Sequence, residues 1–192
     1  MSSEPLSDTI ISSYLSLLGS EHGDYRQAIQ WFKEHENEAR PHLLRALQAD
    51  ERPSLRKRRI IETLGELREE EALPWLSKTL QSGIMLWECA QALAKIGSPE
   101  AEFVLRQALQ DQRLPIVKEC TRALGHIHSK TVGAALQGQL QHKDASVRNY
   151  ALHSLFQCQA QGLGELLIAH LDTEPDPELR SLIQAYLSSK TS

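Results

Sequence analysis

Histidine and cysteine are the residues of this chain whose chemistry suits metal binding or nucleophilic catalysis. The 192-residue sequence contains eight histidines and three cysteines. An oxygen-activating di-iron centre requires His-Glu pairs that recur along the chain, because two irons need opposed ligands. His35-Glu36 is the only such pair in the sequence, and the spacing of His126 and His128 is typical of a solvated turn at a helix end. We therefore expect no catalytic residue, no metal site and no cofactor.

The three cysteines lack the spacing of a disulfide framework or a zinc site. Cys89, Cys120 and Cys158 are odd in number, and no C-x-x-C motif or tight Cys/His cluster occurs. We expect all three to be small buried apolar residues and not reactive thiols. The sequence also lacks a G-x-S-x-G nucleophile elbow, a P-loop, a dinucleotide fingerprint and an H-E-x-x-H pair. These observations favour an interaction protein over an enzyme.

Composition is typical of a folded protein with little affinity for polyanions. Apolar residues make up 41% of the chain, which has 10 glycines and 8 prolines. A formal net charge of −4 argues against a protein that neutralises many phosphates, so nucleic acid is a disfavoured partner. No window approaches eighteen uninterrupted apolar residues, and residues 1–6 lack the features of a secretory signal. We expect a cytoplasmic protein with no membrane partner.

Self-similar helical patterns cover most of the sequence. Apolar residues four apart, as on one face of a helix, occur in Ala72–Leu80, Ala101–Leu109 and Val132–Leu140. Each segment is followed by a second helical pattern with an anchor leucine, and Leu93, Leu124 and Leu155 are 31 residues apart. The second pattern extends back to Leu64 and forward to Leu187. Because one hairpin cannot bury its apolar stripe alone, the hairpins must stack.

The sequence therefore predicts an all-α fold without strands. We expect an α-solenoid, a right-handed superhelix of about six antiparallel helix hairpins. Residues 1–38 would form an N-terminal capping hairpin, in which Gly19 ends the first helix and Asp24 caps the second. Residues 39–192 would form one continuous array of five repeats, at about 39–68, 72–97, 99–128, 130–158 and 160–189. Within it, Gly97 is expected to stop one helix and Ser98 to cap the next, which begins at Pro99.

The array contains four characteristic short segments. They are Asp144-Ala-Ser-Val147-Arg148 with Ala151-Leu152-x2-Leu155, Asp176-Pro-Glu-Leu179-Arg180, Ala123-Leu124-Gly125-x-Ile127 and Leu64-Gly65-x-Leu67. They resemble HEAT repeats, particularly the phycobilisome-lyase type, over about four fifths of the chain. The resemblance implies a HEAT-like solenoid, a fold that serves scaffolds, bilin lyases, toxin-neutralising proteins and a few enzymes. Leu86 and Val117 stand where the family carries arginine, so its Asp-to-Arg pairing between repeats is expected to be absent there.

The same resemblance implies that the second helix of each hairpin lines a concave face. Residues six and two before each anchor leucine, and two after it, share one helix face because they are spaced by four. With the positions beside them, the predicted partner-binding residues are Arg58, Arg59, Glu62, Trp87, Glu88, Gln91, Lys118, Glu119, Arg122, Asn149, Tyr150 and His153. Aromatic residues amid arginines are typical of interaction hot spots. We expect Trp87 to be exposed.

The run Arg56–Arg59 is the strongest charge feature of the sequence. Four cations at the start of a helix oppose its macrodipole, so local interactions should offset them. Acidic residues lie nearby in the sequence at Asp50, Glu51, Glu62, Glu66 and Glu69–Glu71. One interpretation is an intramolecular salt-bridged face of little net energy. The other is a docking patch for an acidic protein segment, a phosphate or RNA.

The leading hypothesis is a non-catalytic protein–protein interaction module, such as a scaffold, an adaptor or an inhibitor of the immunity type. Its partner, another protein, would bind the concave face. A bilin lyase or chromophore-handling subunit is the first alternative, suggested by the repeat subtype, with Trp87, His126, Tyr150 and His153 available to hold a tetrapyrrole. A HEAT-like nucleic-acid binder is the second alternative, and it would use Arg56–Arg59, Lys118, Arg122 and Arg148.

Overall fold

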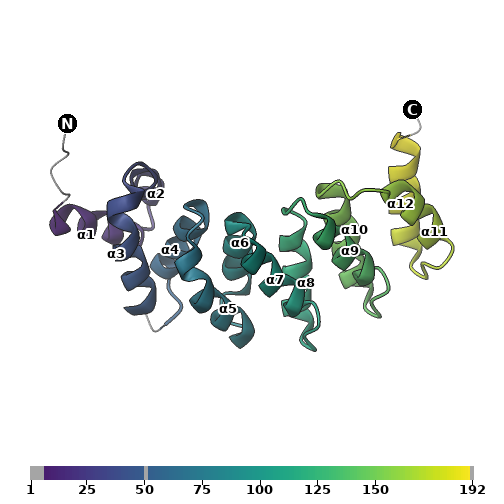
Figure 1. The fold of residues 1–192 in the computed structure, drawn as a ribbon, viewed down its shortest axis with the longest axis horizontal. Coiled ribbons are helices and arrows are strands. Elements are labelled where there is room, and N and C mark those ends of the chain that lie inside the picture. Colours follow the sequence, from purple (N-terminus) through teal and green to yellow (C-terminus); the bar gives the residue numbers. More distant parts are fainter. Residues whose placement is uncertain (1–6, 50–51, 191–192) are drawn as a thin grey trace. The chain divides into compact units, whose positions relative to one another are not determined.

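The computed structural model describes residues 7–49 and 52–190. These residues form twelve α-helices and one short 3-10 turn, without strands (Figure 1). The helices are α1 (Asp8–Leu17), α2 (Tyr25–Glu34), α3 (Glu36–Ala49), α4 (Leu55–Glu66), α5 (Leu73–Ser82), α6 (Leu86–Ile96), α7 (Pro99–Ala108), α8 (Leu114–Leu124), α9 (Lys130–Gln139), α10 (Ala145–Gln157), α11 (Leu163–Leu171) and α12 (Pro177–Lys190), and the 3-10 turn is η1 (Glu70–Ala72). Residues 1–6 and the acidic residues Asp50 and Glu51, considered above, lie outside the described part of the chain.

Consecutive helices pair as hairpins. The first helix of a pair packs on the second in α1–α2, α3–α4, α5–α6, α9–α10 and α11–α12. The all-α, stacked-hairpin architecture of an α-solenoid is therefore confirmed. The chain divides into two compact units, one up to Val104 and the other from Leu105. The handedness of the superhelix and the continuity of one array of repeats stay predictions.

The second helices form the centre of the first unit. Helix α4 packs against both α2 and α6, and α3 and α5 pack on α4 and α6 respectively. The α4–α6 contact is close because Gly65 has no side chain. A Cβ at Gly65 would lie 2.9 Å from the Cα atom of Ala92, which is nearer than carbon atoms approach without strain. The anchor leucines Leu64 and Leu93 are fully buried at this contact.

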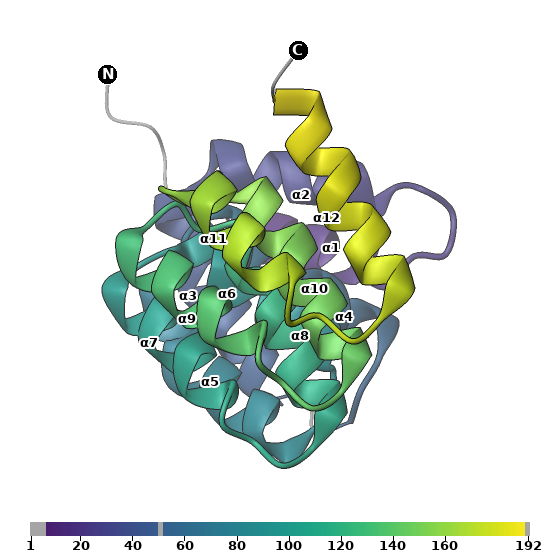
Figure 2. The same cartoon turned by 90° about the vertical axis from the view of Figure 1, so that its right-hand side faces the viewer.

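The second unit repeats this contact between α8 and α10, which lie side by side in Figures 1 and 2. A Cβ at Gly125 would lie 2.8 Å from the Cα atom of Ser154. The hydroxyl of Ser154 donates a hydrogen bond to the carbonyl of Thr121 across the contact, at 2.9 Å. Leu124 and Leu155 are fully buried beside it. Leu64-Gly65 and Leu124-Gly125 thus mark places where two second helices approach closely.

The predicted helix boundaries at Gly97 and Ser98 have the expected geometry, and the predicted cap at Asp24 does not. Gly97 takes a left-handed conformation with φ 63° after α6, and the Ser98 hydroxyl accepts a hydrogen bond from the amide of Ala101 at 3.2 Å. Asp24 stands at the start of α2, but its side chain makes no capping hydrogen bond. The cap predicted there is wrong because Asp24 already has helical φ and ψ, whereas a capping residue is normally extended.

The three cysteines are buried and free, which confirms the prediction made for them. Burial raises the pKa of the Cys89 thiol to about 12, and the nearby Glu88 carboxylate adds to the increase. Burial also raises the pKa of the Cys158 thiol. Both thiols are therefore neutral at physiological pH, which suits core packing and not nucleophilic attack.

Candidate partner-binding surface

A cavity of about 310 Å³ lies over α4 and α6, with the first residue of α2 at its edge. We call it the α4–α6 pocket. Its lining consists of Tyr25, Leu55, Arg58, Arg59, Glu62, Trp87, Glu88, Gln91, Ala92 and Lys95. The structure therefore brings six of the predicted partner-binding residues together in one pocket: Arg58, Arg59, Glu62, Trp87, Glu88 and Gln91.

Apolar side chains are exposed at the pocket. Trp87 is 54% exposed and Leu55 is 39% exposed, and both belong to the first turn of their helices. The exposure of Trp87 confirms the expectation from the sequence. Ile84, in the turn that leads into α6, is 48% exposed. Trp87 and Leu55 line the same pocket, and large apolar side chains that remain exposed near one another are typical of interaction sites.

The turn before α6 has an unusual backbone. Met85 precedes α6 in a left-handed conformation with φ 51°, which costs a non-glycine residue roughly 1–2 kcal/mol. The corresponding residues Ser54, Arg113 and Asp144 before α4, α8 and α10 are all extended. Backbone strain of this kind often occurs at functional sites. Here it lies two residues before Trp87, which lines the α4–α6 pocket.

Ion pairs between helices form the rim of the pocket. Arg58 Nε of α4 lies 3.1 Å from Glu88 Oε1 of α6. Glu66 accepts hydrogen bonds from Lys95 of α6 and Lys33 of α2. The hydrogen bond from Lys95 is the main reason why the pKa of Glu66 lies below its ordinary value, although partial burial opposes this. Exposed pairs of this kind contribute little stability, but they fix the positions of the rim side chains.

Arg59 connects α4 to the end of α1. Its Nη1 donates hydrogen bonds to the carbonyls of Leu18, at 3.1 Å, and Ser20. Its guanidinium carbon lies 3.6 Å from the centroid of the Tyr25 ring. The macrodipole of α1 favours a cation at the carboxyl end of that helix. The quadrupole of the Tyr25 ring favours a cation over its face. Both effects stabilise Arg59 in this position.

Three side chains of the basic run contact other parts of the described chain. Lys57 is 6% exposed, and its ammonium lies 4.8 Å from the centroid of the Trp75 ring. Arg58 pairs with Glu88, and Arg59 with the end of α1. These three contacts join α4 to residues far from it in the sequence.

The other predicted partner-binding residues lie in the second unit. They are Lys118, Glu119 and Arg122 on α8, and Asn149, Tyr150 and His153 on α10. Glu119 and Arg122 pair with each other along α8. Near the ends of the two helices, the His126 ring and the Gln157 amide are 2.9 Å apart. The predicted set therefore consists of two groups, one on each unit.

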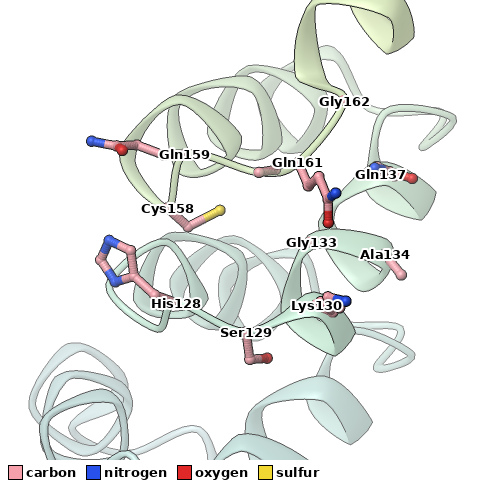
Figure 3. A pocket seen from close by; sticks show the side chains of 11 residues that line it. His128, Ser129, Lys130, Gly133, Ala134, Gln137, Cys158, Gln159, Gln161 and Gly162 are labelled. Carbon is pink, nitrogen blue, oxygen red and sulfur yellow. The ribbon is translucent and has the colours of Figure 1, made fainter.

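A second cavity, of about 450 Å³, lies beside α9 (Figure 3). It is lined by His128, Ser129, Lys130, Gly133, Ala134, Gln137, Cys158, Gln159, Ala160, Gln161 and Gly162. The Cys158 sulfur points toward the middle of this cavity, and His128 lies at its edge. No pattern in the sequence predicts this cavity, because residues 128–137 and 158–162 meet there only in the folded unit.

Arg148, which the nucleic-acid alternative used, is a buried structural residue. It is 6% exposed, and its Nε and Nη2 donate to the carboxylate of Glu174, with Nη2 2.7 Å from Oε1. His170 Nε2 lies 3.0 Å from the other carboxylate oxygen, and the Asp176 amide also donates to Glu174. Burial acts to raise the pKa of Glu174, but the hydrogen bonds from Arg148, Asp176 and His170 hold it below its ordinary value.

This cluster joins α10 to the loop between α11 and α12. Arg148 of α10 reaches forward to that loop, where it binds Glu174. Asp176, the residue of the motif, instead accepts hydrogen bonds from the amides of Glu178 and Leu179 at the start of α12. Sequence reasoning missed Glu174 because it lies outside the motif.

Two kinds of feature are absent from the described residues. Among the side chains that the structure describes, no three or more His, Cys, Asp or Glu residues are grouped so as to hold a metal ion. No helix within residues 7–49 and 52–190 combines the length and hydropathy needed to cross a membrane.

Comparison with known proteins identifies the repeat. Residues 40–121 match the family model of HEAT repeats. No curated protein matches the chain. Among solved structures, a chain in the complex of CpcE and CpcF of phycocyanin lyase from Nostoc sp. PCC7120 is similar, with a TM-score of 0.55 and 21% identity. The similarity covers 95% of this chain and 77% of that chain, and it concerns the fold. The family-model match assigns HEAT repeats to residues 40–121 of the chain.

Proposed function

We propose that this protein is a non-catalytic interaction module that binds a partner protein at the α4–α6 pocket. The observation that carries the proposal is the exposure of Trp87, 54%, in a pocket that it shares with Arg58 and Arg59. Tryptophan and arginine dominate the hot spots of protein interfaces, where a central anchor is surrounded by polar residues. The second helices would thus line the binding face, and a scaffold, an adaptor or an inhibitor would each use it in this way.

Two further observations support a protein partner. The similar phycocyanin lyase structure is itself a complex of two proteins, CpcE and CpcF. In addition, the ion pairs on the rim of the pocket join separate helices, so the surface is organised before a partner arrives. A preorganised surface avoids part of the entropic cost of binding.

Co-purification tests this proposal. The tagged chain, expressed in its own organism, should retain one stoichiometric protein. Trp87→Ala should weaken that binding by about 30-fold or more, because hot-spot truncations cost about 2 kcal/mol or more. Phe103 of α7 is a matched control, since it is an aromatic residue that is 52% exposed outside the pocket. Full binding by Trp87→Ala, or equal loss by Phe103→Ala, would contradict the proposed site.

A chromophore-handling subunit is the second candidate, and the similarity to a phycocyanin lyase chain favours it. Aromatic side chains on the second unit give some support, since Phe156 stacks on Tyr186 at 4.2 Å and meets the edge of the His153 ring. Co-expression with a bilin tests this candidate. A protein that purifies without visible absorption, and whose deletion leaves bilin attachment unchanged, would exclude it.

A further inference from the structure

We infer that the α4–α6 pocket binds a peptide segment of the partner in which a large apolar side chain lies next to a carboxylate. This inference rests on the proposed function and specifies the chemistry of the partner. Three features support this inference. They are the geometry of Arg59, the geometry of Gln91 and the two rows of side chains over α4 and α6.

Arg59 provides a cation that no carboxylate of the described residues neutralises. Its hydrogen bonds to Leu18 and Ser20 both come from Nη1, and the Tyr25 ring covers one face of the guanidinium. Nε and Nη2 make no hydrogen bond within residues 7–49 and 52–190. These two groups form a fork that matches the two oxygens of a carboxylate. Because Arg59 is half-buried, a carboxylate would interact with it more strongly than at an open surface.

Gln91 provides an unused hydrogen-bond donor at the same pocket. Its Nε2 is shielded from solvent and has no hydrogen-bond partner among the described atoms. A buried donor without an acceptor is destabilising, so most such groups in proteins are satisfied. Rotation of the Gln91 amide toward the pocket would let a backbone carbonyl of a bound peptide supply the missing acceptor. The pocket therefore has a place for a peptide carbonyl as well as for a carboxylate.

Two parallel rows of side chains in the pocket indicate the path that the bound peptide would follow. Trp87, Gln91 and Lys95 are spaced by four along α6, and Arg58 and Glu62 along α4, so each set lies on one helix face. The exposed Trp87 and Leu55 lie at the first turns of the two helices. An apolar side chain of the peptide would contact these two residues. The backbone would then follow the rows toward Gln91.

The charges of the pocket favour one carboxylate over a polyanion. Three cations line the pocket, but Glu62 and Glu88 line it too. These carboxylates would repel the successive phosphates of a nucleic acid, and they can accept hydrogen bonds from peptide amides. A peptide with an acidic residue beside its apolar anchor would therefore fit the pocket. Its carboxylate would bind a cation, and its backbone amides would donate hydrogen bonds to Glu62 and Glu88.

Selection from a library of short random peptides displayed on phage tests the inference. The full chain serves as bait, and binders to Trp87→Ala are removed. The expected result is enrichment of peptides that carry Asp or Glu beside Leu, Ile, Phe or Trp. In the best synthetic peptide, replacing Asp by Asn or Glu by Gln should weaken binding by about tenfold, which is typical for loss of a charge-assisted pair. This comparison leaves the protein unchanged, so its folding is not affected.

A double-mutant cycle then assigns the effect to Arg59. Arg59→Gln should abolish the difference between the acidic peptide and its amide variant. Lys78→Gln is the control, because Lys78 is an exposed cation on α5 outside the pocket, and it should preserve the difference.

The outcomes separate the inference from the proposed function. Peptides that need Trp87 but are basic, or that bind equally well as amide variants, would overturn the inference and leave the proposed function standing. A library without any Trp87-dependent binder would contradict both. A single-stranded RNA oligonucleotide that displaces the selected peptide and binds more tightly would also overturn the inference.

Discussion

Glu174 shows how far a single side chain depends on its neighbours. Only 1% of the residue is exposed, and an unpaired carboxylate at such a place would be very costly. Arg148, His170 and the Asp176 amide donate hydrogen bonds to it instead. Because a carboxylate only accepts hydrogen bonds, His170 must carry a proton on Nε2.

Glu174→Gln should destabilise the protein by about 3–5 kcal/mol, because it leaves the buried Arg148 charge without its partner. Denaturant unfolding monitored by circular dichroism measures the change. Glu178→Gln, in the exposed first turn of α12, is the matched control and should have little effect. Equal stability of Glu174→Gln and the wild type would show that the buried pair contributes no net stability.

The pKa of Glu174 also predicts a pH dependence. Its pKa in the folded protein lies below the ordinary value of 4.5, so the folded state favours the ionised carboxylate. The resulting stability is fully present above the ordinary pKa, and it is lost as the pH falls through the lowered folded pKa. The difference in unfolding free energy between wild type and Glu174→Gln should therefore shrink on acidification below about pH 4.5. A difference that stays constant with pH would contradict this assignment.

The second helices pack in the same way in both units. Gly65 faces Ala92 between α4 and α6, and Gly125 faces Ser154 between α8 and α10. In each place a Cβ would meet the backbone of the opposing helix at less than 3.0 Å. Backbone atoms cannot move away as a flexible side chain can, so the two helices themselves would have to separate.

Gly65→Ala and Gly125→Ala should each destabilise the protein by about 1–3 kcal/mol, the usual cost of overpacking. Gly138 of α9 is the control, because a Cβ there would have no neighbour within 4 Å. Gly138→Ala should stabilise the protein by up to about 1 kcal/mol through helix propensity. Thermal unfolding of the three variants measures these changes. Stabilisation by Gly125→Ala would show that α8 and α10 are not in close contact.

Over the whole molecule, stability should be distributed among stacked hairpins, because each hairpin of a repeat protein contacts mainly its neighbours. Leu124→Ala should cost about 2–5 kcal/mol, since Leu124 is fully buried at the α8–α10 contact. Leu187→Ala should cost less, because Leu187 is only half-buried in the terminal helix α12. Denaturant unfolding compares the two variants. A loss at Leu187 that equals or exceeds the loss at Leu124 would contradict a repeat-by-repeat architecture.

The sequence alone determined the helices, the burial of the cysteines and the exposure of Trp87. These properties follow from helical periodicity, which places residues four apart on one face and is readable within a single helix. The same periodicity brought Arg58, Glu62, Trp87 and Gln91 onto the face where the α4–α6 pocket lies.

Only the tertiary structure decided the partners of individual side chains and the cavities between loops. Arg59 binds the carbonyl of Leu18, 41 residues earlier, and Arg148 binds Glu174, 26 residues later. The cavity beside Cys158 joins segments that are separate in the sequence. Periodicity identifies the face on which a side chain lies. The atom that it contacts depends on how closely neighbouring helices approach and on the paths of the loops between them, and these are properties of the packed fold.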